Sequence, residues 1–336
     1  MAEDAPLPLG KLPAALLREL LAAGPPPPED LRLPPAVGED ACVIQVAGGA
    51  LVAATDPITL TGHGIGAHAV VVNANDVAVL GVRPRWFLAC VLLPAGTREA
   101  EVRAVFEEMR TALAGIDAAL VGGHTEVTGA VTQTVVVGQM LGLREDGRFV
   151  RTGGVQATDI VLQIGPAPIE GAAVLAREAG ERLRDVPEAL LERARAALRD
   201  PGISVVDAAL RAADLGATAL HDPTEGGLSA GLHELAEASG LALRVDVGSL
   251  LWFEPGLALC DAVGADPWGV LASGTLLAAF PAASAEAARD VLAGEGYAVG
   301  SIARAEPGVG VCRADGSRLP RHERDELSRV LGADPA

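Results

Sequence analysis

Three aspartates carry the clearest chemical signal in this chain, because each lies inside or at the edge of an apolar segment. They are Asp40, Asp56 and Asp76, and no Lys or Arg lies between residues 32 and 83 to pair with them locally. An ionised carboxylate beside a packed core is unfavourable unless it is paired or bound to a cation. We therefore expect these side chains to bind a metal ion. For Asp40 or Asp56 alone, an aspartate that bonds to its own turn is the alternative.

Polar residues interrupt the apolar run that contains the third aspartate, Val72-Asn73-Ala74-Asn75-Asp76-Val77. Asn73 and Asp76 are three residues apart and share one face of a helix, so an amide and a carboxylate can point at one ligand. A plain core helix does not carry polar residues at the centre of its apolar face. The segment therefore favours a binding function over simple packing.

Two glycine-containing motifs could receive an anion. The first is Gly-Gly-His-Thr-Glu at residues 122–126, where the glycines let backbone amides approach an anion beside His124 and Thr125. In the second, residues 221–228, Thr224 is a candidate cap for a helix whose N-terminal amides favour a phosphate, with Asp222 on the approach. For each motif, an ordinary turn without a ligand is the alternative.

Apolar periodicity predicts two α/β units of similar element order, with a restart of the pattern near residues 153–154, although no residue-level repeat is visible. In the first unit we predict helices at 12–23, 67–80 and 98–114, the last capped by Thr97, and strands at 41–46, 50–55, 86–93, 119–121 and 132–143. In the second we predict strands at 160–164 and 242–247 and an apolar segment at 270–280. We also predict helices at 187–199, 205–215 and 285–292, a helix that begins at 169 and a helix that ends at 238. The predicted domains are therefore an N-terminal helix and Pro-rich linker at 1–35, a first domain at 36–152 and a second at 153–336.

Composition excludes several classes of function. The 26 basic and 44 acidic residues give a net charge of −18, which repels nucleic acid and anionic membranes. An anionic ligand would need divalent cations to bridge it to such a protein. Neither a signal peptide nor a membrane span is visible, and the four cysteines form no Cys-x-x-Cys pair. We expect a cytoplasmic protein with buried, reduced thiols and with no nucleic-acid or membrane partner.

Taken together and in order, the motifs resemble those of the aminoimidazole-ribonucleotide synthetase-like superfamily, from Gly38 to Phe280. The matching segments are Gly-Glu-Asp-Ala at 38–41, Thr-Asp-Pro-Ile at 55–58, the run at 72–78, Gly-Val-Arg-Pro-Arg-Trp at 81–86, Gly-Gly-His-Thr-Glu-Val at 122–127 and Asp-Pro-Thr-Glu-Gly-Gly at 222–227. The last two segments are most similar to the hydrogenase-maturation, HypE-like members of the superfamily.

This resemblance implies an α/β (α+β) fold of two domains, with an N-terminal domain that forms a homodimer through a shared β-barrel and a C-terminal α/β domain beside it. It implies ATP in a cleft between domains or subunits, with the phosphates held through Mg²⁺, and in-line attack on the γ-phosphate. By position it implies metal ligands Asp40, Asp56 and Asp76, catalytic residues Asp222 and His124, and cofactor-binding residues Asn73, Asn75, Gly122, Gly123, His124, Thr125, Thr224, Gly226 and Gly227.

The chain also departs from the maturation factors. Its last residues, 331–336, lack the cysteine that carries their carbamoyl group, and Glu225 stands where they often have Arg. We therefore do not expect the cyanide-forming dehydration. Without a glycine-rich N-terminal loop bearing Cys or Sec, we do not expect selenophosphate synthesis either. Lys11, on the N-terminal arm, is expected to be solvated.

Two hypotheses of different class remain open. One is an ATP-dependent enzyme that phosphorylates a small molecule, as thiamine-monophosphate kinase does, or activates an amide or carboxylate of an unidentified small-molecule or protein acceptor. The other is a non-catalytic nucleotide-binding protein of a maturation or regulatory complex. An acidic metal-binding fold without a nucleotide is a third interpretation.

Overall fold

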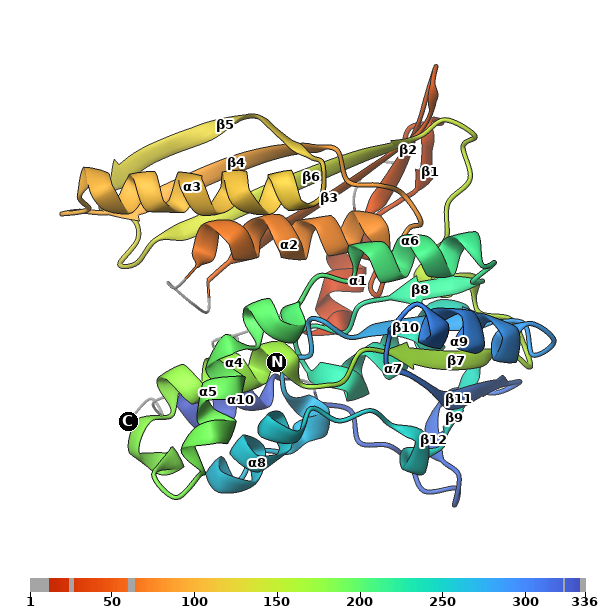
Figure 1. Cartoon of the computed structure of the whole chain (residues 1–336). Coiled ribbons are helices and arrows are strands. Elements are labelled where there is room, and N and C mark those ends of the chain that lie inside the picture. The colour runs from red at the N-terminus through yellow and green to blue at the C-terminus, as the bar shows by residue number, and fades with distance from the viewer. Residues whose placement is uncertain (1–11, 24–26, 60–63, 323, 333–336) are drawn as a thin grey trace, which may run out of the picture.

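The protein folds as two mixed sheets, each covered by helices (Figure 1). This computed structural model describes residues 12–23, 27–59, 64–322 and 324–332. Lys11, for which the sequence predicts a solvated side chain, lies outside the described residues. The structure confirms the two-domain α/β architecture that the sequence predicts.

The first sheet has the strand order β1-β2-β3-β6-β4-β5, in which only β4 and β5 run parallel. Its strands are β1 (Leu31–Leu33), β2 (Cys42–Val46), β3 (Gly49–Ile58), β4 (Trp86–Pro94), β5 (Ala119–Thr128) and β6 (Val135–Arg144). Helices α2 (Ile65–Ala78) and α3 (Glu99–Gly115) cover one face (Figure 1). Buried and less buried positions alternate along β3 and β4, as expected for strands with one face in a core.

The second sheet has the order β12-β9-β11-β7-β10-β8, in which only β12 and β9 run parallel. Its strands are β7 (Ile160–Ile164), β8 (Ala219–His221), β9 (Ala242–Val245), β10 (Leu276–Phe280), β11 (Val299–Glu306) and β12 (Gly310–Arg313). The remaining helices are α1 (Ala14–Ala22), α4 (Ile169–Glu178), α5 (Glu188–Ala196), α6 (Val206–Asp214), α7 (Gly227–Ser239), α8 (Glu254–Val263), α9 (Ala285–Gly294) and α10 (Glu326–Leu331).

Three local predictions were wrong or incomplete. The strand predicted at 119–121 continues through both glycines to Thr128, so residues 122–123 form no turn. Thr97 does not cap α3: its hydroxyl donates to the Pro94 carbonyl, and the N-cap is Arg98. The elements β8, α8, β11, β12 and α10 were not predicted, and part of the segment predicted as a linker forms β1.

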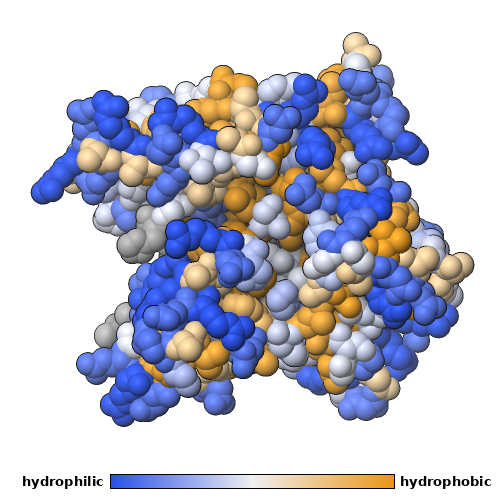
Figure 2. All heavy atoms as spheres, viewed as in Figure 1, coloured by the Kyte–Doolittle hydropathy of each residue, from blue (hydrophilic) through white to orange (hydrophobic). Residues whose placement is uncertain are grey.

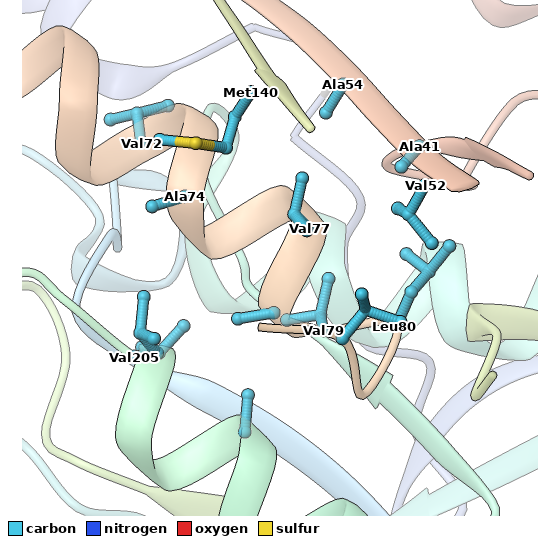
Figure 3. Close-up of a cluster of buried hydrophobic side chains, with 14 of the residues drawn as sticks. Ala41, Val52, Ala54, Val72, Ala74, Val77, Val79, Leu80, Met140 and Val205 are labelled. Carbon is cyan, nitrogen blue, oxygen red and sulfur yellow. The ribbon is translucent and has the colours of Figure 1, made fainter. Parts of the chain in front are cut away.

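Helix α2 lies at the centre of the molecule and joins the two domains. One side packs on β3 and β6 and another on α6 of the second domain, which explains why nearly every residue of α2 is buried. The hydrophobic core therefore runs through the domain boundary, and Val205 before α6 belongs to the same buried cluster as Ala74 and Val77 (Figure 3). Small side chains allow this close approach of helix to helix and helix to sheet.

No helix among the described residues is long and apolar enough to cross a membrane. Figure 2 shows a hollow in the surface between the first domain and the part of the second domain that carries α4 and α5.

Candidate functional site

The two domains meet in a buried ion-pair arrangement centred on His221, the last residue of β8. Its Nδ1 lies 2.9 Å from Oδ2 of Asp40, which precedes β2 in the first domain, and its Nε2 lies 2.9 Å from Oε2 of Glu234 on α7. Burial alone would lower the pKa of His221, but the Asp40 and Glu234 carboxylates outweigh it and raise the pKa well above its ordinary value. The two carboxylates therefore favour the protonated form of the ring.

Asp222, the next residue, is the most unusual group in the protein. It is 2% exposed, and neither of its carboxylate oxygens has a hydrogen-bond partner. Burial raises its pKa well above the ordinary value, and the charge of Asp40 raises it further; the charge of His221 lowers it, and the charge of Asp56 raises it by a smaller amount. Acceptors that are buried and unsatisfied are rare in native proteins and indicate an absent partner.

The chemistry of this donor set fits a hard divalent cation. The charges of Asp40 and Asp56 act on the carboxylate of Asp222, and carboxylate oxygens are the ligands that Mg²⁺ prefers. Among the described residues, no three His, Cys, Asp or Glu side chains already form a complete metal site. Mg²⁺ is usually held by only one or two carboxylates together with water and substrate phosphates, so an incomplete protein site is what a Mg–nucleotide complex requires.

Asn73 is engaged by backbone groups rather than turned toward a ligand. Its Oδ1 accepts from the Asp56 amide at 2.9 Å, and its Nδ2 donates to the carbonyls of Ala69 at 2.9 Å and Asp56 at 3.2 Å. The side chain thereby fastens α2 to β3 at Asp56, two residues before the end of the strand. We conclude that Asn73 positions Asp56. Asp76 is buried on the same helix, 6% exposed.

Asn75 contacts the second domain. Its Nδ2 donates to the Ile203 carbonyl and its Oδ1 accepts from the Val205 amide, both at 2.9 Å. Both backbone groups belong to the segment that leads into α6. Asn75 therefore satisfies the exposed backbone of a chain segment 128 to 130 residues away in sequence and joins the domains.

The Gly-Gly-His-Thr motif lies on β5, an edge strand of the first sheet, whereas Asp56 lies on β3. Asp56 pairs with Gly138, Gly138 with Ala89, and Ala89 with Gly123, so these residues form one row across four strands. At about 4.8 Å per strand, the row separates Gly123 from Asp56 by roughly 14 Å. Within one chain, the motif and the aspartates are therefore separate.

Packing explains the second glycine of this motif. Gly123 has φ +142°, and a Cβ there would lie 2.0 Å from the Ala89 carbonyl oxygen, so only glycine fits beside β4. His124 is 65% exposed and lies 3.4 Å from Glu126. A surface hollow of 330 Å³ adjoins the motif, lined by Ala89, Phe106, Leu120, Gly122, Gly123, His124 and Thr125.

The N-terminus of α7 is already occupied by a carboxylate of the chain. The N-cap is Gly226, and its amide donates to Asp325 Oδ2 at 2.9 Å, so Thr224 is not the cap that the sequence predicts. Burial raises the pKa of Asp325 to about 6, although three backbone amides that donate to it oppose the shift. A Cβ on Gly227 would lie 2.5 Å from the Trp268 carbonyl oxygen. Both glycines are therefore tightly packed by protein.

Sequence reasoning missed two functional candidates, Glu234 and Glu39, and one buried pair. Glu234 has no sequence signal, because it lies 13 residues after His221 and its role appears only in the fold. Glu39 did have a sequence signal, because it stands beside Asp40. Its Oε2 is buried without a hydrogen-bond partner, and burial raises the pKa of Glu39. His68 and Glu170 form a second buried pair between the domains, at 2.6 Å.

Comparisons with known proteins agree with this architecture. Two family models match, AIR synthase related protein, N-terminal domain, at residues 38–143, and AIR synthase related protein, C-terminal domain, at residues 156–312. The chain is 31% identical to carbamoyl dehydratase HypE of Rhodobacter capsulatus over 234 residues, which are 69% of this chain and 66% of that protein.

Solved structures show the same fold. A crystal structure of a HypE–HypF complex gives a TM-score of 0.72 at 23% identity, covering 92% of this chain and 100% of that chain. A structure of the hydrogenase maturation protein HypE in complex with ATP gives 0.66 at 24% identity, covering 85% and 89%.

Proposed function

Because this chain belongs to the AIR synthase related family, we propose that it is a magnesium-dependent ATP-binding enzyme that transfers or uses the γ-phosphate to activate an acceptor. The acceptor would be a small molecule or a protein that offers an oxygen or nitrogen nucleophile. The observation that carries the proposal is Asp222, whose buried carboxylate has no partner and lies under the electrostatic influence of Asp40 and Asp56.

In this proposal one or two of the carboxylates of Asp40, Asp56 and Asp222 bind Mg²⁺ directly, and the phosphates and water complete its coordination. When bound, the metal would neutralise the phosphate charge that otherwise opposes an attacking nucleophile. The residues of the chain bind the metal and orient its ligands. Asn73 fixes the backbone of Asp56, and His221 holds Asp40 against the second domain. The boundary between the domains, where these groups meet, is then the phosphate end of the nucleotide site.

We also propose that a second copy of this chain completes the site, through the dimeric β-barrel that the family resemblance implies. Strand β5 is an edge strand of the first sheet, and Val121 and Val127 on it are 53% and 57% exposed. An exposed apolar edge strand favours pairing with another strand. A partner copy would bring its own Gly122–Thr125 motif, including His124, close to the aspartates of this chain. Within one chain, the distance between the motif and Asp56 prevents this.

Asp325 favours a second candidate function, a nucleotide-binding protein without turnover. This carboxylate occupies the N-terminal amides of α7, which the sequence suggests as a phosphate site. A phosphate would have to displace Asp325 or bind entirely through the carboxylate-held cation. In the second case, binding without phosphate transfer is a consistent outcome.

The experiment combines binding and turnover. We expect ATP to raise the unfolding temperature only when Mg²⁺ is present, and the variant Asp222→Asn to lose this shift while remaining folded. Glu178→Gln, an exposed change on α4, is the matched control. Hydrolysis or transfer would then be measured with amide, carboxylate and alcohol acceptors. Tight Mg–ATP binding without turnover would favour the second candidate, and no thermal shift with Mg–ATP would refute both.

A further inference from the structure

Asp40 lies in an irregular segment before β2 and depends on the second domain for its orientation. Its Oδ2 is 2.9 Å from Nδ1 of His221 and 3.4 Å from the Thr152 hydroxyl, so both contacts fall on one oxygen. Oδ1 is therefore the oxygen that Asp40 can offer to a cation. The direction in which it points follows from the direction of the His221 ring.

The His221 ring is in turn held by Glu234. Each ring nitrogen of His221 lies 2.9 Å from a carboxylate oxygen, Nδ1 from Asp40 and Nε2 from Glu234. Contacts on both sides of the ring fix its rotation. Without Glu234, the Nε2 side would lose its contact, and the ring could turn and carry Nδ1 away from Asp40. Glu234 therefore holds the ring in the direction that keeps Nδ1 against Asp40.

We propose that Glu234 is a positioning residue for the metal site: through His221 it orients Asp40 so that one carboxylate oxygen faces the cation. This inference rests on the proposed magnesium–ATP function and adds to it a residue of α7. The side chains of His221, Asp40 and Glu234 are 3%, 17% and 16% exposed, so water competes little for their hydrogen bonds. The arrangement resembles the carboxylate–histidine pairs that orient metal ligands in other proteins, with an aspartate as the ligand.

A neighbouring glutamate on the same helix provides a matched control. Glu237 lies one turn further along α7 and is 38% exposed. It pairs with Arg18 at 3.2 Å and with Arg321, and has no contact with His221. Glu234→Gln and Glu237→Gln therefore remove the same charge from the same helix, but only the first removes it from the ring. A helix-wide electrostatic effect would appear in both variants.

The test measures the affinity of Mn²⁺ for the full chain in the presence of a non-hydrolysable ATP analogue, by electron paramagnetic resonance of free Mn²⁺. We expect about tenfold weaker Mn²⁺ binding in Glu234→Gln, as for the loss of other residues that orient metal ligands, and unchanged binding in Glu237→Gln. In the metal-free wild type, nitrogen-15 NMR should show two protected ring N–H groups for His221, assigned by their loss in His221→Gln. In Glu234→Gln the Nε2–H group should lose its protection.

The outcomes separate this inference from the proposed function. Wild-type binding of Mn²⁺ and the analogue, with equal affinity in Glu234→Gln, would overturn the positioning role while leaving the proposed function standing. A loss of thermal stability in Glu234→Gln without a change in Mn²⁺ affinity would likewise show that Glu234 only stabilises the fold. No binding of Mn²⁺ by the wild type would refute the proposed function itself.

Discussion

The buried pair of His68 and Glu170 yields a quantitative prediction about the domain boundary. His68 lies on α2 and Glu170 on α4, with Nε2 and Oε1 2.6 Å apart and side chains 4% and 7% exposed. Burial opposes the charged forms, but the attraction between the two groups outweighs it: the pKa of His68 is raised and that of Glu170 is lowered. We expect Glu170→Gln to destabilise the protein in a strongly pH-dependent way.

The sign follows from the two pKa shifts. Because the folded pKa of His68 is raised, its contribution is fully present below the unfolded value of 6.5 and is lost as pH rises through the folded pKa. Because the folded pKa of Glu170 is lowered, its contribution is present above the unfolded value of 4.5 and is lost as pH falls through the folded pKa. The pair therefore contributes most between these two unfolded values.

Removing one partner of a buried ion pair typically costs about 3–5 kcal/mol, because the other charge is left without compensation. An imidazole can avoid this cost by losing its proton, which is easy above pH 6.5 and costs about 1.4 kcal/mol for each pH unit below it. Glu170→Gln should therefore cost about 2–3 kcal/mol near pH 5.5 and about 1 kcal/mol, the value of a neutral hydrogen bond, near pH 9.

Chemical denaturation followed by far-ultraviolet circular dichroism would measure this at pH 5.5 and pH 9.0. The lower value stays above the isoelectric point of about 4.7, where the protein would be least soluble. Glu178→Gln, at the exposed end of α4, is the control for helix charge. The double variant His68→Leu with Glu170→Leu should recover most of the lost stability. An equal effect of Glu170→Gln at both pH values would refute the reasoning.

Three further predictions concern single residues. Asp222→Asn should stabilise the metal-free protein by about 1–3 kcal/mol at pH 8. The pKa of Asp222 is raised, so its ionised form costs stability as pH rises, and thermal unfolding without metal measures the gain. Asn75→Ala should destabilise by about 2–4 kcal/mol in denaturant titrations, since it leaves two buried backbone groups unpaired, and a loss below 1 kcal/mol would contradict this. Gly227→Ala should lower the unfolding temperature and weaken Asp325 capping, because φ +66° and the Trp268 carbonyl both exclude a Cβ; a variant as stable as wild type would count against the packing described here.

Much of the fold could be predicted from local patterns. Apolar periodicity located α2, α3, β4 and β7 to within a few residues, because amphipathic spacing depends only on neighbours along the chain. Prediction failed at the Gly122–Gly123 pair. A local pattern reads two glycines as a turn, whereas the close approach of β4 demands a glycine inside the strand.

The candidate site was predicted in part. Asp40, Asp56 and Asp222 were singled out from their types and settings, and the charges of Asp40 and Asp56 raise the pKa of Asp222. For Asn73 and Asn75, the position was recognised but not the role, because an amide in an apolar helix can serve a ligand or the backbone of another segment. Packing decides between these, and here both amides bind backbone groups.

The sequence by itself determined that several carboxylates of the chain lie in apolar settings with no cation near them, and so need a partner from elsewhere. Only the tertiary structure decided what that partner is. His221 contacts Asp40 across 181 residues of chain, and Glu234 on α7 contacts the other ring nitrogen of His221. Electrostatic interactions depend on distance in space and on the exclusion of water, and neither quantity is set by separation along the chain.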